Sequence, residues 1–436
     1  MADKPPIRAK DRDTIIRALR AGVVPRLGLQ HIQVGRKREI EALVSDIDRV
    51  GDGGSTVRFI IGTYGAGKTF FLFLVRQIAL QKKLAVMQAD LGPDKRIHAT
   101  GGQAQTLYSE LVKSLATRAF PDGGALRSMI ESFISDTADR AQGRPIVDAI
   151  TARLAPLREM ISGPDFAAVI AAYARGFDEG NEPLQEAALR WLRGEYTTKT
   201  QAREDLGVRT IIDDSSFYDA LRLWARFSRL AGYGGLLVCL DEMVNLYKLQ
   251  NAQARKLNYE QILHILNDAL QGTTEGLGIV FGGTPDFLMD TRRGLYSYEA
   301  LQSRLAENSF ASSTLIDLGG PVIHLQNLSV EELWHLLEKL RDVFALNDTA
   351  RYLVPDEALD AFLDHCRSRI GDAYFQTPRN SIKSFVDLLA ILEQNPGSSW
   401  REMLGAVQVD RDEQGLIESA VPPDEADGDD LATLRL

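Results

Sequence analysis

The sequence predicts an α/β fold in which a parallel sheet is combined with two all-helical regions. Short apolar runs typical of buried parallel strands lie at 57–61, 84–89, 236–240, 278–281 and 322–325. Between about residues 101 and 229 the apolar spacing is helical throughout, and the same holds after residue 328. A sheet core with a helical insertion and a helical C-terminal domain accounts for this order.

The first hundred residues contain a strand–helix–strand unit. A helix is predicted to begin near Asp13 and to break at Pro25 and Gly28, and a second helix follows over about 36–50. A strand, a glycine-rich loop, a helix and a second strand then succeed one another at 57–61, 62–69, 69–79 and 84–89. This order is the opening βαβ unit of an α/β sheet.

The remaining elements follow from the same patterns. Helices are predicted in the insertion at 107–119, 144–160, 166–177, 184–192 and 217–230. Further helices are predicted at 259–270, at 330–344 and on to about 392, and at 399–404. The chain then divides into six parts. These are a basic N-terminal arm (1–35), the first part of the core (36–100), the insertion (101–230), the second part of the core (231–327), the C-terminal helical domain (328–410) and an acidic, disordered tail (411–436).

Charge is distributed unevenly along the chain. The 50 Lys and Arg and 60 Asp and Glu residues give a net charge of −10, which excludes a generic basic nucleic-acid coat. Residues 1–40, however, carry ten basic and four acidic side chains. Any contact with double-stranded DNA is therefore expected from a local patch, and the arm is the first candidate for it. The alternative is that the basic residues of the arm only form a solvated helix face. These residues are Arg8, Lys10, Arg12, Arg17 and Arg20.

Several classes of protein are excluded by what the sequence lacks. No apolar run approaches the roughly 18–20 residues that span a bilayer, so no membrane association is expected. The two cysteines, Cys239 and Cys366, form no CxxC pair, which argues against a zinc site or a disulfide framework. A cytoplasmic location is expected, because the N-terminus has no signal-peptide pattern.

Residues 62–69, GTYGAGKT, match the Walker A pattern G-x-x-x-x-G-K-[ST]. Such glycines turn backbone N–H groups toward a triphosphate, while the Lys reaches the β- and γ-phosphates and the Thr ligates Mg²⁺. The alternative is a glycine-rich turn that only joins strand to helix, but the match lies directly between an apolar strand and an apolar helix, as the motif requires. We predict ATP and Mg²⁺ as cofactors, bound by Gly62, Thr63, Tyr64, Gly65, Ala66, Gly67, Lys68, Thr69 and Phe70.

A phosphate loop of this kind also needs carboxylates. The apolar strand 236–240 is followed by Asp241 and Glu242, as expected for a Walker B motif at the carboxyl end of a parallel strand. Asp241 is predicted to serve the metal with Thr69, and Glu242 to polarise the attacking water. The alternative is an acidic helix N-cap after a strand.

Five further residues are candidates for acting on the phosphates. Thr284 follows the strand 278–281 and would position water, or it only forms a Gly-Gly-Thr-Pro turn. Arg304, and after it Arg292 and Arg293, are candidates for an arginine acting on the nucleotide of a neighbouring subunit. Arg379 opens an apolar helix of the C-terminal domain, from which it would reach back to the nucleotide.

With these motifs in this order, the chain resembles AAA+ ATPases, in the branch of the origin-recognition and Cdc6-like initiators and the signal-transduction ATPases, over about residues 36–392. The resemblance implies an adenine pocket at Gly35 and Arg36, a first sensor at Thr284, a second sensor at Arg379 and a helical lid after Leu328. More narrowly, the segments 16–26, 64–69 and 378–379 look like the ATP-binding proteins of BREX-type phage defence. Partner helicases or nucleases and homo-oligomers are implied by that resemblance.

The chain departs from the initiators in two respects. Lys68 and Asp241 are 173 residues apart, so the helical insertion lies inside the ATPase core. The sequence after Leu392 is too short and too acidic for a winged-helix DNA-binding domain. The leading hypothesis is an ATPase that acts on DNA or on a DNA-processing partner. A nucleotide-gated scaffold with incidental hydrolysis is the alternative, and a small-molecule kinase fits the lid and sensor pattern less well.

Overall fold

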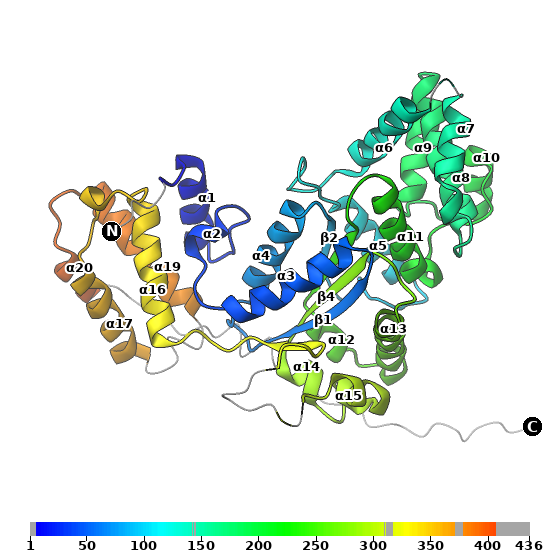
Figure 1. The fold of residues 1–436 in the computed structure, drawn as a ribbon. Helices are drawn as coiled ribbons and strands as arrows, with labels where there is room; N and C mark the ends of the chain where they lie inside the picture. The colour runs from blue at the N-terminus through cyan, green and yellow to red at the C-terminus, as the bar shows by residue number, and fades with distance from the viewer. Residues whose placement is uncertain are drawn as a thin grey trace, which may run out of the picture.

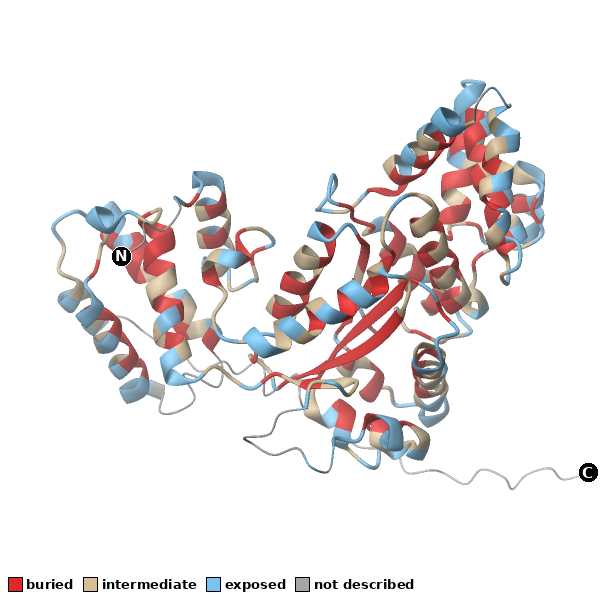
Figure 2. Ribbon diagram, in the orientation of Figure 1, coloured by how far each residue is buried: buried red, intermediate tan, exposed pale blue. Residues whose placement is uncertain are grey.

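The core is a five-stranded, fully parallel sheet with the strand order β2-β3-β4-β1-β5, seen in a computed structural model that describes residues 6–141, 143, 145–308, 310, 317–370 and 378–406. The strands are β1 (Ser55–Ile61), β2 (Ala85–Asp90), β3 (Leu236–Asp241), β4 (Leu277–Gly283) and β5 (Val322–His324). Every residue of β1, β3 and β4 is buried (Figure 2), which is typical of parallel strands covered on both faces. The predicted α/β class and all five predicted strands are confirmed.

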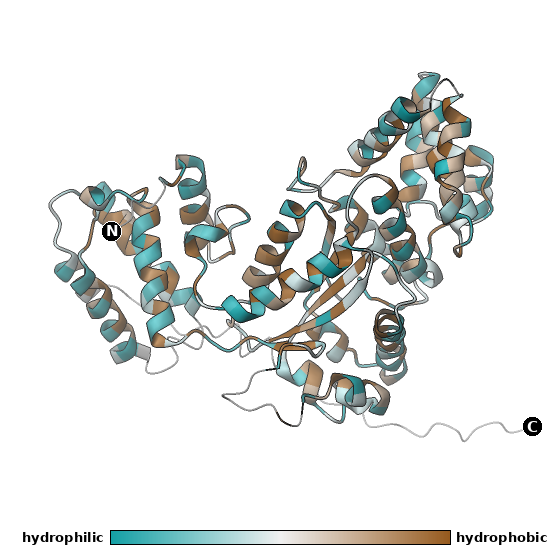
Figure 3. Cartoon of the chain, viewed as in Figure 1, coloured by the Kyte–Doolittle hydropathy of each residue, from teal (hydrophilic) through white to brown (hydrophobic). Residues whose placement is uncertain are grey.

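Alternate residues of each strand enter two different cores. Ile60 of β1 packs with α3 (Lys37–Gly51) and α4 (Lys68–Gln81) on one face of the sheet. Its neighbour Phe59 belongs to the core on the opposite face, which α5 (Gln103–Lys113), α11 (Phe217–Leu230) and α13 (Ala252–Gln271) cover. The apolar strands between these helices are brown in Figure 3. Three short helices, α12 (Val244–Tyr247), α14 (Pro285–Met289) and α15 (Glu299–Leu305), follow β3 and β4.

The insertion is helical, as predicted, but its helices differ from the sequence interpretation. Between α5 and α11 lie α6 (Leu126–Arg140), α7 (Ile146–Arg153), α8 (Gly163–Asp178), α9 (Glu182–Leu192) and α10 (Lys199–Leu206). The sequence missed α6 and α10, and α7 ends well before residue 160. The helix predicted at 107–119 ends at Lys113, because Ala116 exchanges two backbone hydrogen bonds with Val86 along the edge of β2.

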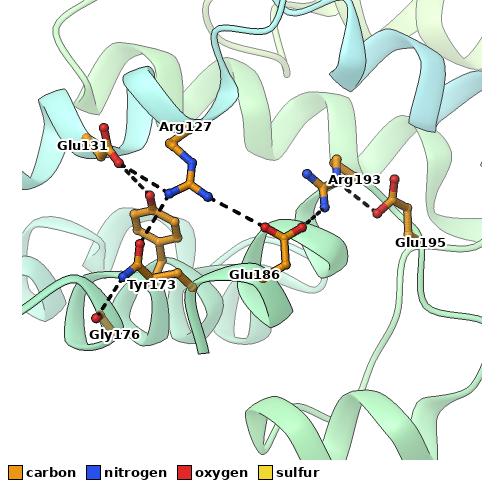
Figure 4. A network of polar contacts seen from close by, with 8 residues as sticks. Arg127, Glu131, Tyr173, Gly176, Glu186, Arg193 and Glu195 are labelled. Carbon is orange, nitrogen blue, oxygen red and sulfur yellow. Dashed lines mark hydrogen bonds and ion pairs between the residues drawn. The ribbon is translucent and has the colours of Figure 1, made fainter. Parts of the chain in front are cut away.

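A network of polar side chains joins α6, α8 and α9 on the surface of the insertion (Figure 4). The Tyr173 hydroxyl donates to Glu131 Oε1 at 2.8 Å, and burial raises the pKa of this tyrosine. Arg127 lies between the carboxylates of Glu131 and Glu186, at 4.0 and 3.7 Å, and Glu186 also pairs with Arg193. These contacts fix the mutual positions of three helices at the edge of the apolar core, to which the buried Tyr173 ring belongs.

The C-terminal helices form a separate domain with a core of its own, which we call the lid. It consists of α16 (Val330–Phe344), α17 (Asp356–Ile370), α19 (Pro378–Gln394) and α20 (Trp400–Ala406), beside the sheet in Figure 1. The predicted acidic tail at 411–436 lies outside the described residues. Within the described ranges, no helix is long and apolar enough to cross a membrane.

The N-terminal residues belong to the lid, which corrects the expectation of a separate basic arm. The helix α1 (Ala9–Arg20) packs on α16 and α19, and the one-turn helix α2 (Leu29–Ile32) packs on α16. Ile7, Ile15 and Ile32 are buried in the lid core. Two arginines of α1 face lid carboxylates, Arg12 pairing with Glu393 and Arg20 with Asp387, so the charge of α1 is partly neutralised within the chain.

Candidate functional site

The phosphate loop joins the carboxyl end of β1 to the first residue of α4. Gly65 and Gly67 have φ angles of 81° and 82°, in the left-handed region that favours glycine. A Cβ atom on Gly62 would lie 3.0 Å from the Cβ of Ala66 and 3.1 Å from the carbonyl oxygen of Leu325. The backbone therefore requires glycines at the positions where the motif has them, and it ends on a helix N-terminus that favours anions.

Lys68 is held inside this loop. Its Nζ atom donates to the carbonyl oxygens of Gly62 at 2.9 Å and Thr63 at 3.0 Å. Burial lowers the pKa of Lys68, and the negative charges of Asp241 and Glu242 oppose that effect. The ammonium group is therefore partly desolvated and close to both carboxylates, which is where it would meet the terminal phosphates of a nucleotide.

Thr69 and Asp241 are brought together from the two sides of the loop. The Thr69 hydroxyl donates to Asp241 Oδ2 at 2.8 Å, and Asp241 Oδ1 accepts the backbone N–H of Glu242 at 2.9 Å. Asp241 is only 2% exposed, and its carboxylate lies where Gly282 has no Cβ: an added Cβ would be 2.3 Å from Oδ1. A hydroxyl and a carboxylate at the foot of a phosphate loop are the oxygen donors that Mg²⁺ takes, so the residues fit this ion.

Glu242 has an unusual backbone conformation for a residue with a side chain, since its φ angle is 58°. Such a conformation costs about 1–3 kcal/mol and is concentrated at functional sites. Glu242 directly follows β3, and its charge acts on Lys68. Asp241 thus contacts the loop through Thr69, and Glu242 is the next residue of the chain. The N-cap interpretation does not describe this pair, because Met243 is the N-cap residue of α12 and no side-chain cap is formed there.

Thr284 and the candidate arginines have other contacts. Thr284 is the N-cap of α14, accepting from the backbone N–H of Phe287 at 3.4 Å, so the turn interpretation holds while its water-positioning role stays a prediction. Arg304 is exposed on α15, and its Nε atom donates to Asn267 Oδ1 at 2.7 Å. Arg293 is buried against the carbonyl oxygen of Leu249, which removes it from the candidates that an adjacent subunit could reach. Arg292 remains exposed.

The lid reaches the phosphate loop through Arg379, as the sequence predicts for its location. Arg379 Nη1 donates to the hydroxyl of Tyr64 at 3.1 Å. Phe70, at the start of α4, packs against the apolar core of the lid. The loop residue Tyr64 and the α4 residue Phe70 therefore both contact the lid. Tyr64 and Arg379 are 315 positions apart in the sequence.

Arg36 is hydrogen-bonded to the backbone of the phosphate loop. Its Nη2 atom donates to the carbonyl oxygen of Ala66 at 3.1 Å and also to that of Gln326. Burial lowers the pKa of Arg36, and Glu39 and Glu332 oppose the shift. Gly35 has a φ angle of 60° and lies against Glu332, whose Oε1 would be 2.1 Å from an added Cβ. The contribution of Gly35 and Arg36 to an adenine pocket stays a prediction.

Sequence reasoning missed two residues beside the loop. Asn327 accepts the hydroxyl hydrogen bond of Thr63 at 2.9 Å, and it lies between β5 and the lid, where no sequence pattern marks it. Asp90 is paired in register with Asp241 on the neighbouring strand. Desolvation, followed by the charge of Asp241, raises the pKa of Asp90. Its position as the last residue of an apolar strand was the available signal.

A parallel sheet with a phosphate loop after its first strand and an acidic pair after its third defines an α/β nucleotide-binding protein of the P-loop class. The chain belongs to the family of BREX system ATP-binding proteins BrxC/D, whose family model matches residues 7–408. No individual curated protein matches it. The resemblance to the ATP-binding proteins of BREX-type phage defence is thereby confirmed, and ATP is the nucleotide that the family binds.

Proposed function

We propose that the chain hydrolyses ATP in the presence of Mg²⁺ and uses the cycle to act on DNA or on a DNA-processing partner in phage defence. The observation that carries the hydrolytic part is the convergence of Lys68, Thr69, Asp241 and Glu242 at one edge of the sheet. Binding alone requires the loop and a metal ligand. A second carboxylate, that of Glu242, is not needed for binding. Its presence in a strained backbone conformation next to Asp241 is explained if it activates the water that attacks the γ-phosphate.

In the proposed reaction, the loop N–H groups and Lys68 hold the β- and γ-phosphates, and Glu242 orients a water molecule. The water oxygen forms a bond to the γ-phosphorus, the bond from that phosphorus to the bridging oxygen of ADP breaks, and Glu242 accepts the proton of the water. Mg²⁺, held by Thr69 and Asp241, would neutralise charge on the phosphate oxygens. Arg379 would approach the same phosphates from the lid.

Replacing Glu242 by Gln tests the assignment of the base. Turnover should fall by about 10²–10⁴-fold, because the amide cannot accept the proton, while ATP affinity is retained. Phosphate release and binding of a fluorescent ATP analogue are the two measurements. Glu204→Gln, an exposed position on α10, serves as the matched control. Equal phosphate release by the wild type and the Glu242 variant would remove the base from the mechanism.

The partner and the assembly are the least constrained parts of the proposal. Turnover measured with and without double-stranded DNA should rise on addition of DNA if the chain acts on it. Slow turnover that DNA leaves unchanged favours the scaffold alternative, with the insertion as the platform for a partner helicase or nuclease. A homo-oligomer is proposed because the exposed Arg304 has a role in hydrolysis only if a neighbouring subunit's nucleotide lies against it.

A further inference from the structure

The connection between α1 and α3 runs from the lid to the phosphate loop. We call residues 21–36 the strap; it contains α2 and ends at Arg36. Its N-terminal end continues α1, which lies antiparallel to α19: Arg12 pairs with Glu393 and Arg20 with Asp387. Near its C-terminal end the strap is bound to α16, since Lys339 Nζ donates to the carbonyl oxygen of Gln33. The strap is thus fastened to two lid helices.

The strap also contacts the sheet core. The carbonyl oxygen of Arg26 accepts from Gln77 Nε2 of α4 at 2.8 Å. At the far end of the strap, Arg36 holds the carbonyl oxygen of Ala66 in the phosphate loop. One continuous segment therefore contacts the lid, the helix that follows the loop, and the loop itself, although α16, the first of the C-terminal lid helices, begins only at Val330.

Within the strap, Gly22 lies directly against Arg379. It has a φ angle of 69°, and an added Cβ would be 3.1 Å from Nε and 3.4 Å from Nη2 of Arg379. The same guanidinium donates to the Tyr64 hydroxyl of the phosphate loop. Gly28, with a φ angle of 77°, brings the strap back against α1, because an added Cβ would be 2.7 Å from Cδ1 of Ile15. The backbone of the strap thus lies directly beside the Arg379 side chain.

We propose that the strap positions Arg379 for the ATP reaction, with Gly22 setting how closely the backbone supports the guanidinium beside Tyr64. The N-terminal segment is then part of the nucleotide machinery. The proposal rests on the role given to Arg379 under the proposed function. It adds that this role depends on a residue that contacts neither phosphate nor metal.

Replacing Gly22 by Leu tests the strap, because the side chain must displace the Arg379 guanidinium. Gly180→Leu is a matched control: Gly180 has a φ angle of 67° and nothing within 4 Å of an added Cβ, so the backbone penalty is alike and the steric conflict is missing. We expect kcat/KM to fall about tenfold in Gly22→Leu, as in Arg379→Ala, and to stay within about twofold in Gly180→Leu. Tm values report any common loss of stability.

The double variant Gly22→Leu/Arg379→Ala distinguishes a positioning role of Gly22 from a merely structural one. If Gly22 acts through Arg379, the double variant is no slower than Arg379→Ala, whereas independent effects multiply. Multiplying effects, or equal losses in Gly22→Leu and Gly180→Leu, overturn the proposal. An Arg379→Ala variant with wild-type ATP affinity and turnover overturns the role of Arg379 itself. Because affinity for the fluorescent ATP analogue is measured in every variant, the strap is tested even if wild-type hydrolysis is absent.

Discussion

The insertion and the lid are both helical, but they are attached to the sheet in opposite ways. The insertion shares one apolar core with the sheet, since Phe59 of β1, Tyr108 of α5 and Trp224 of α11 belong to the same cluster. Buried hydrogen bonds reinforce it: Trp224 Nε1 donates to the Tyr108 hydroxyl at 2.8 Å, and that hydroxyl donates to the carbonyl oxygen of Leu192 at 2.7 Å. The lid has its own core, and it meets the phosphate loop and the start of α4 through the hydrogen bond from Arg379 to Tyr64 and the packing of the partly buried Phe70.

This difference separates a rigid part of the molecule from a part that is able to move. Displacing α5 or α11 would expose apolar surface on the sheet, at a cost of about 25 cal/mol per Å². Displacing the lid would exchange the hydrogen bond from Arg379 to Tyr64 for bonds to water or nucleotide, at a net cost of about 1 kcal/mol, and would uncover only the partly buried ring of Phe70. We therefore expect nucleotide binding to displace the lid and the strap more readily than the insertion.

The largest expected effect comes from breaking the shared core. Phe166 of α8 is fully buried and contacts the rings of Trp191, Trp224 and Phe227. Replacing it by Ala should cost about 3–5 kcal/mol, and the loss should reach the sheet because the core is continuous. Hydrogen exchange followed by mass spectrometry should show faster exchange in α8 and in β3 together. Faster exchange in α8 with β3 unchanged would mean that the insertion is an independent unit.

A smaller and more local effect is expected from the lid core. Leu337 of α16 is fully buried there, and Leu337→Ala should cost about 2–5 kcal/mol. Exchange should rise in α16, α17 and α19 while β1 and β3 keep their protection, because the two cores are separate. ATP should still bind, but more weakly, since Arg379 lies on the loosened domain. Equal loss of protection in the sheet would contradict the separation on which the comparison depends.

Much of the fold and the site was predictable because the signals are local. Strands β1 to β5 are short apolar runs, and α11 and α16 were predicted with their observed limits because each has a complete apolar stripe. The phosphate loop is fixed by glycines with left-handed φ angles at Gly65 and Gly67, a requirement that is visible in sequence. The location of Arg379 beside the loop was predicted from its order in the motif series.

The failures concern contacts between distant segments. The arginines of α1 were considered for DNA, because the carboxylates that face Arg12 and Arg20 come from the other end of the chain, at Glu393 and Asp387. The helix predicted at 107–119 was too long, since its last residues instead pair with the edge of β2. Arg293 could not be distinguished from the exposed Arg292 by sequence, and only packing buries it.

By itself, the sequence determined the parallel sheet, the phosphate loop and the acidic pair that follows β3. These features depend on backbone conformation and apolar spacing within a few residues, which the chain encodes locally. Only the tertiary structure decided that the N-terminal helix belongs to the lid, that the insertion is continuous with the core of the sheet, and that Gly22 lies against Arg379. Those relations join segments hundreds of residues apart, and they arise because packing complementary surfaces compensates for the entropy of bringing them together.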